Sequence, residues 1–157
     1  MITPEAHLRS TISAALPRLT AITDAAAALP RAPGKWSRKE IVGHLIDSAS
    51  NNHERFVRAH FSDDLICPTY DQDAWVRVQR YGAAPWGELV VLWSHFNTQL
   101  ARVIEATPSE IRRRSRARHN LDRVAFRRLA PGEPATLEYF MSDYVVHLEH
   151  HLAQILD

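Results

Sequence analysis

Three histidines within five residues near the C-terminus, His147, His150 and His151, are the side chains of this sequence best suited to chemistry. Residues four apart in an α-helix lie on one face, so the imidazoles of His147 and His151 can approach one point, as a divalent metal ion requires. His150 lies about 60° away and is expected to be a neighbour rather than a ligand. The same H-x-x-x-H spacing occurs in the zinc-protease helix, but Leu148 stands where that motif has its general-base glutamate, which excludes a protease of that kind.

A metal site needs at least one more ligand, because one helix face supplies only two. The best candidate is His44, which a helical projection places at the edge of an apolar stripe. The stripe contains Ile41, Val42, Leu45, Ala49 and Phe56, and its edge contains His44, Ser48, Asn51 and Arg55. Facing helices of a bundle often combine their ligands in the bundle interior. A lone histidine beside a core is nevertheless more often structural than a ligand, so both interpretations of His44 remain open.

Helix-start signals define the elements that would position these residues. Thr3, Pro4 and Glu5 indicate a first helix that runs to about residue 29, with a kink or break near Pro17. Ser37 and Glu40 form a capping box at the start of the second helix.

The remaining helices are indicated in the same way. Asp71 is expected to cap a short helix, Pro85 to begin the third long helix, and Thr136 to cap the fourth. Four long amphipathic segments predict an all-α fold, a four-helix bundle with long connections between helices 2 and 3 and between helices 3 and 4. Those lengths permit crossover connections.

Length and composition predict one globular domain spanning residues 1–157, since 45% of the residues are hydrophobic and 24% are charged. The only cysteine, Cys67, cannot form an internal disulfide, which favours a reducing compartment. No signal peptide or membrane span is recognisable, so we expect a cytoplasmic protein. The net charge of +1 gives no reason to expect a nucleic acid or a membrane as a partner.

Between Arg112 and Arg128 the periodicity lapses and eight arginines occur. Two interpretations are open: a solvated connection, which we favour because aromatic residues are not interleaved, or a basic patch for phosphate or nucleic acid.

Four segments together resemble the DinB-like superfamily, and in particular its YfiT-like (DinB_2) branch. They are residues 34–37 (GKWS), 40–48 (EIVGHLIDS), 70–75 (YDQDAW) and 147–154 (HLEHHLAQ). The resemblance implies a four-helix bundle, often a homodimer, that binds a divalent metal such as nickel or zinc through His44, His147 and His151. Members include S-transferases that use bacillithiol or mycothiol, a maleylpyruvate isomerase and metal-dependent hydrolases. The arginine-rich segment departs from some relatives.

The leading functional hypothesis is a metal-dependent enzyme that transfers a low-molecular-weight thiol to a small electrophile, because a metal can itself lower the pKa of a thiol. The alternatives are a metal-dependent hydrolase, in which Asp47 or Asp73 could reach a water, and a non-catalytic metal-binding or ligand-sensing module. Substrate-binding candidates are Asp47, Asn51, Arg55, Asp73 and Asn97. Each also has a structural interpretation, as a salt bridge, an interhelical hydrogen bond or a core amide.

Overall fold

The computed structural model describes residues 2–157 and confirms the all-α four-helix bundle. The long helices are α1 (Pro4–Thr20), α3 (Arg38–Arg58), α5 (Trp86–Ala106) and α8 (Leu137–Leu156). Short elements connect them: α2 (Asp24–Ala28), α4 (Gln72–Gln79), the 3-10 helix η1 (Tyr81–Ala83), α6 (Ser109–Arg113) and α7 (Leu121–Val124). Across residues 2–157, none of the helices combines the length and the apolar character needed to cross a membrane.

The capping residues define the helix starts as predicted. The Ser37 hydroxyl accepts a hydrogen bond from the Glu40 backbone N–H (3.3 Å), and the Glu40 carboxylate accepts one from the Ser37 N–H (2.7 Å), so the capping box is complete. Asp71 and Thr136 each accept from the N–H three residues later, at 3.0 and 3.1 Å. Thr3 occupies the N-cap position of α1 without a side-chain cap bond.

The predicted break near Pro17 is in the wrong place. Helix α1 continues through Pro17 and ends at Thr20, and the chain then turns before Thr23 caps α2 with its hydroxyl. Pro17 is exposed, outside the continuous buried stripe of α1. That stripe consists of Pro4, Leu8, Ile12, Ala15 and Leu19. Packing of the stripe compensates for the one backbone hydrogen bond that proline removes.

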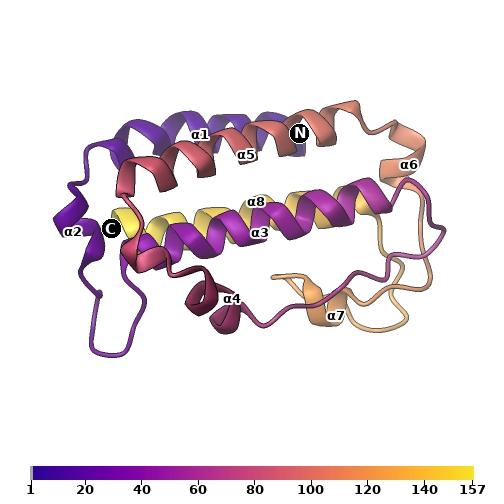
Figure 1. Ribbon diagram of the computed structural model, residues 1–157. Coiled ribbons are helices and arrows are strands. Elements are labelled where there is room, and N and C mark those ends of the chain that lie inside the picture. Colours follow the sequence, from indigo (N-terminus) through magenta and orange to yellow (C-terminus); the bar gives the residue numbers. More distant parts are fainter. Residues whose placement is uncertain (1) are drawn as a thin grey trace.

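The long connections follow from the helix directions. In Figure 1, α3 and α5 run one way along the bundle, and α1 and α8 run the other way. Helix α3 contacts α5 and α8, and α1 contacts the same two helices. Since α3 and α5 are parallel neighbours, the chain between them must return along the bundle, and α4 and η1 form on that return path.

The two long connections are joined to each other on one side of the bundle. The backbone of Leu65 donates to the Arg118 carbonyl (2.9 Å) and accepts from the Asn120 N–H (3.3 Å). The Asn120 side chain bonds both the N–H and the C=O of Cys67, at 2.9 and 2.8 Å. The chain segments carrying α4 and α7 therefore lie together beneath α3 in Figure 1.

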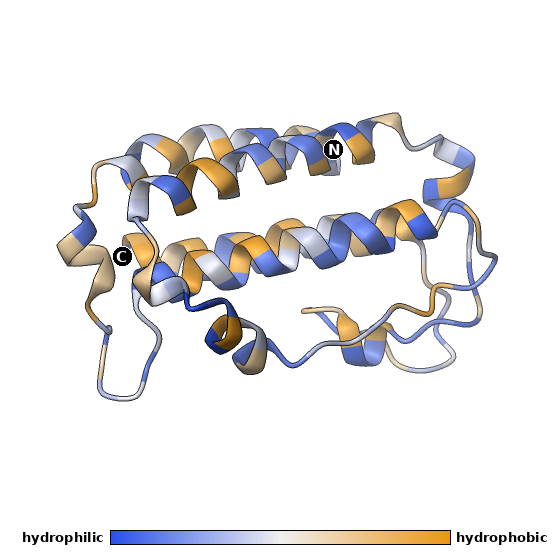
Figure 2. Ribbon diagram, viewed as in Figure 1, coloured by the Kyte–Doolittle hydropathy of each residue, from blue (hydrophilic) through white to orange (hydrophobic). Residues whose placement is uncertain are grey.

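Apolar side chains fill the space between the four long helices. Hydrophobic and polar positions alternate along each helix in Figure 2, as expected for elements that bury one face. Phe56 of α3 packs edge-on against Phe140 and Tyr144 of α8, with ring centroids 5.7 and 6.2 Å apart. Such aromatic pairs stabilise by about 0.5–1.5 kcal/mol beyond their buried area, so they help to fix the register of α3 on α8.

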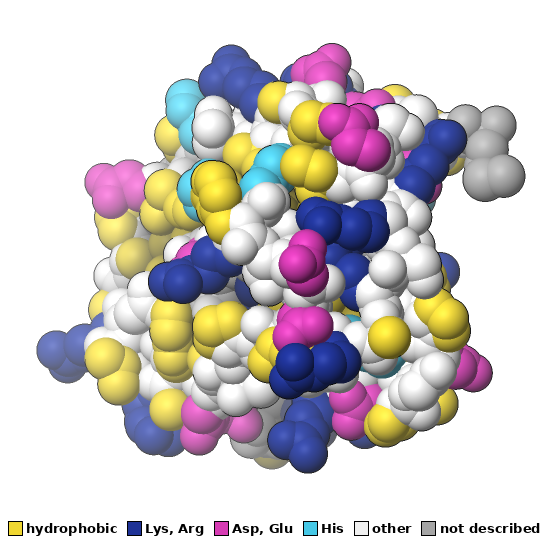
Figure 3. Space-filling view, turned by 90° about the vertical axis from the view of Figure 1, so that its right-hand side faces the viewer, with side chains coloured by type: hydrophobic (Ala, Val, Ile, Leu, Met, Phe, Trp, Pro, Cys, Tyr) yellow, Lys and Arg dark blue, Asp and Glu magenta, His cyan; other side chains and the backbone are white. Residues whose placement is uncertain are grey.

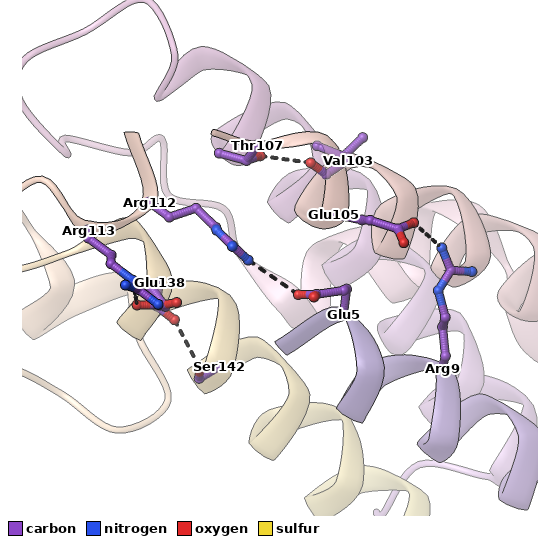
Figure 4. A network of polar contacts seen from close by, with 9 residues as sticks. All are labelled: Glu5, Arg9, Val103, Glu105, Thr107, Arg112, Arg113, Glu138 and Ser142. Atoms are coloured by element: carbon purple, nitrogen blue, oxygen red, sulfur yellow. Dashed lines mark hydrogen bonds and ion pairs between the residues drawn. The ribbon is translucent and has the colours of Figure 1, made fainter. Parts of the chain in front are cut away.

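Most of the arginine-rich segment is paired with acidic groups, which agrees with the connection interpretation rather than with a basic patch. Basic and acidic side chains are interspersed on the face shown in Figure 3. Arg112 contacts Glu5 and Arg113 contacts Glu138, both at 3.3 Å, as Figure 4 shows. The guanidinium of Arg116 is buried and donates to backbone carbonyls instead.

Gly43 permits the close approach of the crossover connection to α3. A Cβ atom at this position would overlap the Tyr81 ring of η1. Because the ring packs directly on the helix, the Tyr81 hydroxyl reaches Asp47, one turn further along α3 (2.7 Å). This contact fixes the 81–83 segment against residues 43–47 of α3.

We predict that Gly43→Ala destabilises the protein by about 1–3 kcal/mol, because the added methyl group displaces the Tyr81 ring. Gly87→Ala is the matched control: it also lies in a helix, and its added Cβ meets no atom within 4 Å. Alanine has the higher helix propensity, so the control should gain stability, by up to about 1 kcal/mol. Urea unfolding measures both, and a gain for Gly43→Ala would contradict the packing described.

Candidate functional site

Helices α3 and α8 bring the three predicted metal ligands together. The ligand atoms of His44, His147 and His151 all lie within 4.8 Å of one another. The Nε2 atoms of His44 and His147 are 3.3 Å apart. Two nitrogens of a tetrahedral zinc site, each about 2.0–2.1 Å from the ion, are separated by roughly 3.3 Å, so this pair fits a shared ion without rearrangement.

Hydrogen bonds to the outer ring nitrogens orient two of the three imidazoles. The Nδ1–H of His151 donates to the amide oxygen of Gln154 (2.9 Å), which leaves the lone pair of Nε2 free. Nδ1 of His147 lies 3.5 Å from the Ser48 hydroxyl. The buried Nδ1 of His44 has no protein partner. Partners on the outer nitrogens are typical of metal-ligating histidines.

Burial keeps these imidazoles neutral at physiological pH. It lowers the pKa of His44 to about 4, with a smaller effect from the charge of His151. It lowers the pKa of His147 to about 2, with further effects from the neighbouring histidines and from Arg55. Burial also lowers the pKa of His151, although the bond to Gln154 opposes this. Only neutral imidazoles offer lone pairs to a metal, so little proton competition is expected at pH 7.

A cavity of about 470 Å³ opens beside His147 and His151, in the groove between α3 and α8. The joined connections form its other wall. Its lining from α3 and α8 comprises Ser48, Asn52, Arg55, Phe140, Asp143, Tyr144, His147, His150 and His151. Its lining from the connections comprises Thr69, Tyr70, Gln72, residues 123–126 and Arg128.

Two of the substrate-binding candidates are core residues outside this cavity. Asn97 is fully buried, donates to the Trp93 carbonyl (2.9 Å) and accepts a short hydrogen bond from the Tyr144 hydroxyl. One Asp47 oxygen accepts from Tyr81 and from Gln79, both at 2.7 Å, and burial raises the pKa of its carboxyl group. Both residues match their structural interpretations.

The other three candidates differ in position. Asn51 bonds the Asp47 carbonyl (2.9 Å) and does not line the cavity, whereas its neighbour Asn52 does. Asp73 is exposed and belongs to a separate surface hollow beside Trp36. Arg55 is the candidate that the structure places in the cavity wall.

Several cavity residues were not identified from the sequence. Asp143 lies four residues before His147, so the same helical spacing that links the histidines could have identified it. Tyr70, Arg128 and Phe126 lie in irregular segments. No periodicity there indicates which way a side chain points.

We predict that metal binding stabilises the wild-type protein and that His147→Ala removes most of this effect. A metal concentration 100 times the Kd should contribute about 2.7 kcal/mol to the free energy of unfolding. His150→Ala, which alters the adjacent histidine, should retain the gain. Thermal melts with zinc or nickel and with chelator measure it, and an equal gain in both variants would argue against His147 as a ligand.

We also predict that the metal-free protein loses stability as the pH falls from about 6.5 towards 4. In this range the unfolded chain protonates His44 and His147 while the folded chain keeps them neutral. Each such histidine contributes a slope of up to about 1.4 kcal/mol per pH unit. Urea midpoints at several pH values should show a smaller slope for His44→Gln than for the wild-type protein.

Comparisons with known proteins agree with this architecture. The chain is 27% identical over 137 residues to the "Putative metal-dependent hydrolase YfiT" of Bacillus subtilis (strain 168), covering 87% of this chain and 71% of that protein. The solved structure of YfiT from Bacillus subtilis is described as a probable metal-dependent hydrolase with an unusual four-helix bundle topology. It matches with a TM-score of 0.77 and 21% identity, over 97% of this chain and 81% of the other, so it shows a shared fold. The family described as the DinB superfamily matches residues 7–155, and the chain therefore belongs to that superfamily.

Proposed function

We propose that this protein is a divalent-metal-dependent enzyme that transfers a low-molecular-weight thiol, of the bacillithiol or mycothiol kind, to a small electrophile. The observation that carries the proposal is a three-imidazole cluster beside a cavity whose lining offers no free carboxylate. Three protein ligands leave coordination positions open, unlike the four of a structural zinc site. Imidazole ligands suit both zinc and nickel.

The hydrogen bonds and positions of the nearby carboxylates favour thiol transfer over hydrolysis. Asp143 is the acidic residue of the cavity lining, and its two oxygens accept from the backbone N–H groups of Phe126 and Arg127, both at 2.7 Å. Asp47 is held by Tyr81 and Gln79, and Asp73 lies in the other hollow. Hydrolysis is helped by a general base directed at the attacking water, and these carboxylates are poorly placed for that role.

Thiol transfer requires less of the protein. A bound divalent ion would supply the chemistry, by lowering the pKa of a thiol so that it is held as the nucleophilic thiolate. The chain then has to hold the ion, shield the cavity and orient the electrophile. His147 and His151 reach the cavity from one side, and Tyr70 and Phe126 provide apolar surface for a small molecule.

Hydrolysis is the second candidate, favoured by the name of the Bacillus subtilis relative and by His150. The His150 ring lines the cavity, and its Nε2 lies 3.2 Å from the Gln154 amide nitrogen. Because the Gln154 oxygen accepts from His151, that amide nitrogen donates to His150. This bond occupies the Nε2 lone pair, so the imidazole can serve as a general base only once the bond to Gln154 opens.

We predict metal-dependent conjugation of monochlorobimane to bacillithiol, mycothiol or cysteine by protein loaded with zinc or nickel. His151→Ala should abolish conjugation because a ligand is lost, whereas His150→Gln should retain most of it because thiol transfer needs no base there. Elemental analysis of protein purified without added metal identifies the ion.

Activated esters form the second arm of this experiment. Ester hydrolysis that requires the metal and falls in His150→Gln, without thiol conjugation, would reverse the assignment to a hydrolase. Inactivity in both arms would favour a non-catalytic module.

A further inference from the structure

The cavity contains a buried positive charge that no acidic side chain neutralises. Arg55 is 7% exposed, and its guanidinium donates to the Pro68 carbonyl (2.6 Å) and to the Asn52 side chain (3.4 Å). Its Nε–H has no partner. The adjacent Glu54 pairs with Arg58 instead (2.7 Å). Among residues 2–157, no carboxylate lies within 4.0 Å of the Arg55 guanidinium.

Such an arrangement costs folding free energy, because a charge removed from water needs a compensating partner. The rings of Tyr70 and Phe140, with centroids 5.9 and 6.0 Å from the guanidinium carbon, supply only part of that compensation. Both rings line the same cavity as Arg55. An anion bound in the cavity would complete the charge balance.

Two further arginines increase the positive charge of the cavity. Arg123 and Arg128 are exposed at its wall, and only Arg123 has an acidic neighbour, Asp122, at 3.7 Å. The one acidic lining residue, Asp143, is already paired with Arg127 (3.2 Å). Within the described residues, the cavity therefore has an excess of cations.

The positions along α3 give the cavity two chemically distinct ends. His44, Ser48, Asn52 and Arg55 share one face of the helix, and His44 and Arg55 are separated by roughly 16 Å along its axis. The Arg55 side chain leans back towards the helix N-terminus, which shortens this distance. The guanidinium is separated from the imidazole cluster by Ser48 and Asn52, and the aromatic rings of Tyr70 and Phe140 lie beside it.

We propose that the cavity binds a small molecule bearing a carboxylate, which Arg55 holds and which Arg123 and Arg128 attract at the entrance. A carboxylate fits because guanidinium presents a planar fork of donors and because one buried cation balances one negative charge. The inference deepens the proposed function, on which it rests, by naming the class of its substrate.

The test compares 4-phenylbutyrate with its neutral amide, 4-phenylbutanamide, by calorimetric titration of metal-loaded and metal-free protein. The metal-free arm removes carboxylate binding to the ion itself. We expect the carboxylate to bind at least tenfold more tightly than the amide in both forms, and Arg55→Gln to remove that preference, as loss of a charge-assisted hydrogen bond predicts about 10- to 100-fold weaker binding.

Further variants at exposed positions allow the proposal to be tested even if Arg55→Gln does not fold. The double substitution Arg123→Gln and Arg128→Gln alters exposed side chains and should weaken binding of the carboxylate but not of the amide. Arg31→Gln, an exposed arginine outside the cavity, is the matched control and should change neither.

Equal binding of carboxylate and amide, or an unchanged preference in a folded Arg55→Gln variant, would overturn the proposal and leave Arg55 as a structural anchor of the 67–70 segment. Tighter binding of inorganic phosphate than of the carboxylate would overturn the ligand class. Carboxylate binding without thiol conjugation would contradict the proposed function alone, and conjugation without carboxylate preference would contradict this inference alone.

Discussion

The antiparallel packing of α3 against α8 is the constraint on which the candidate site depends. His44 comes from one helix and His147 and His151 from the other, so their convergence requires a particular register between the two. At the far end of this contact, the Phe56 ring packs edge-on against Phe140 and Tyr144. A shift of one helical turn, about 5.4 Å, would separate the ligand atoms and open the aromatic cluster together. Packing and site geometry therefore depend on one interface.

The connection between α3 and α5 helps to form a cavity wall that the four long helices alone do not provide. A parallel pair of neighbouring helices obliges the chain to return along the bundle, and here the return segment lies over α3 and is tied to the 118–120 segment by backbone hydrogen bonds. Side chains from both connections then face the groove between α3 and α8. A bundle with short loops would leave that groove open to solvent, whereas here the two connections form one wall of it.

Burial of polar groups in this region lowers the free energy of unfolding. The imidazoles of His44 and His147 are desolvated, and the charge of Arg55 lacks an acidic partner. Unsatisfied groups of this kind destabilise a protein unless a ligand completes their interactions. His147 and Arg55 line the cavity, and His44 lies beside it. Asn97, by contrast, is buried with its hydrogen bonds made inside the core.

Local chemistry in the sequence determined the four long helices, three helix caps and the pairing of His147 with His151. Ser37, Asp71 and Thr136 act through residues within three positions, and the pair His147 and His151 follows from helical periodicity alone. Tertiary structure decided the rest. It carried α1 through Pro17, because a continuous buried stripe compensates for one lost hydrogen bond. It also placed Asn52 rather than Asn51, and Arg55 rather than Asp47, in the cavity wall. A cavity wall depends on how distant segments pack against each other, and helical periodicity does not encode that packing.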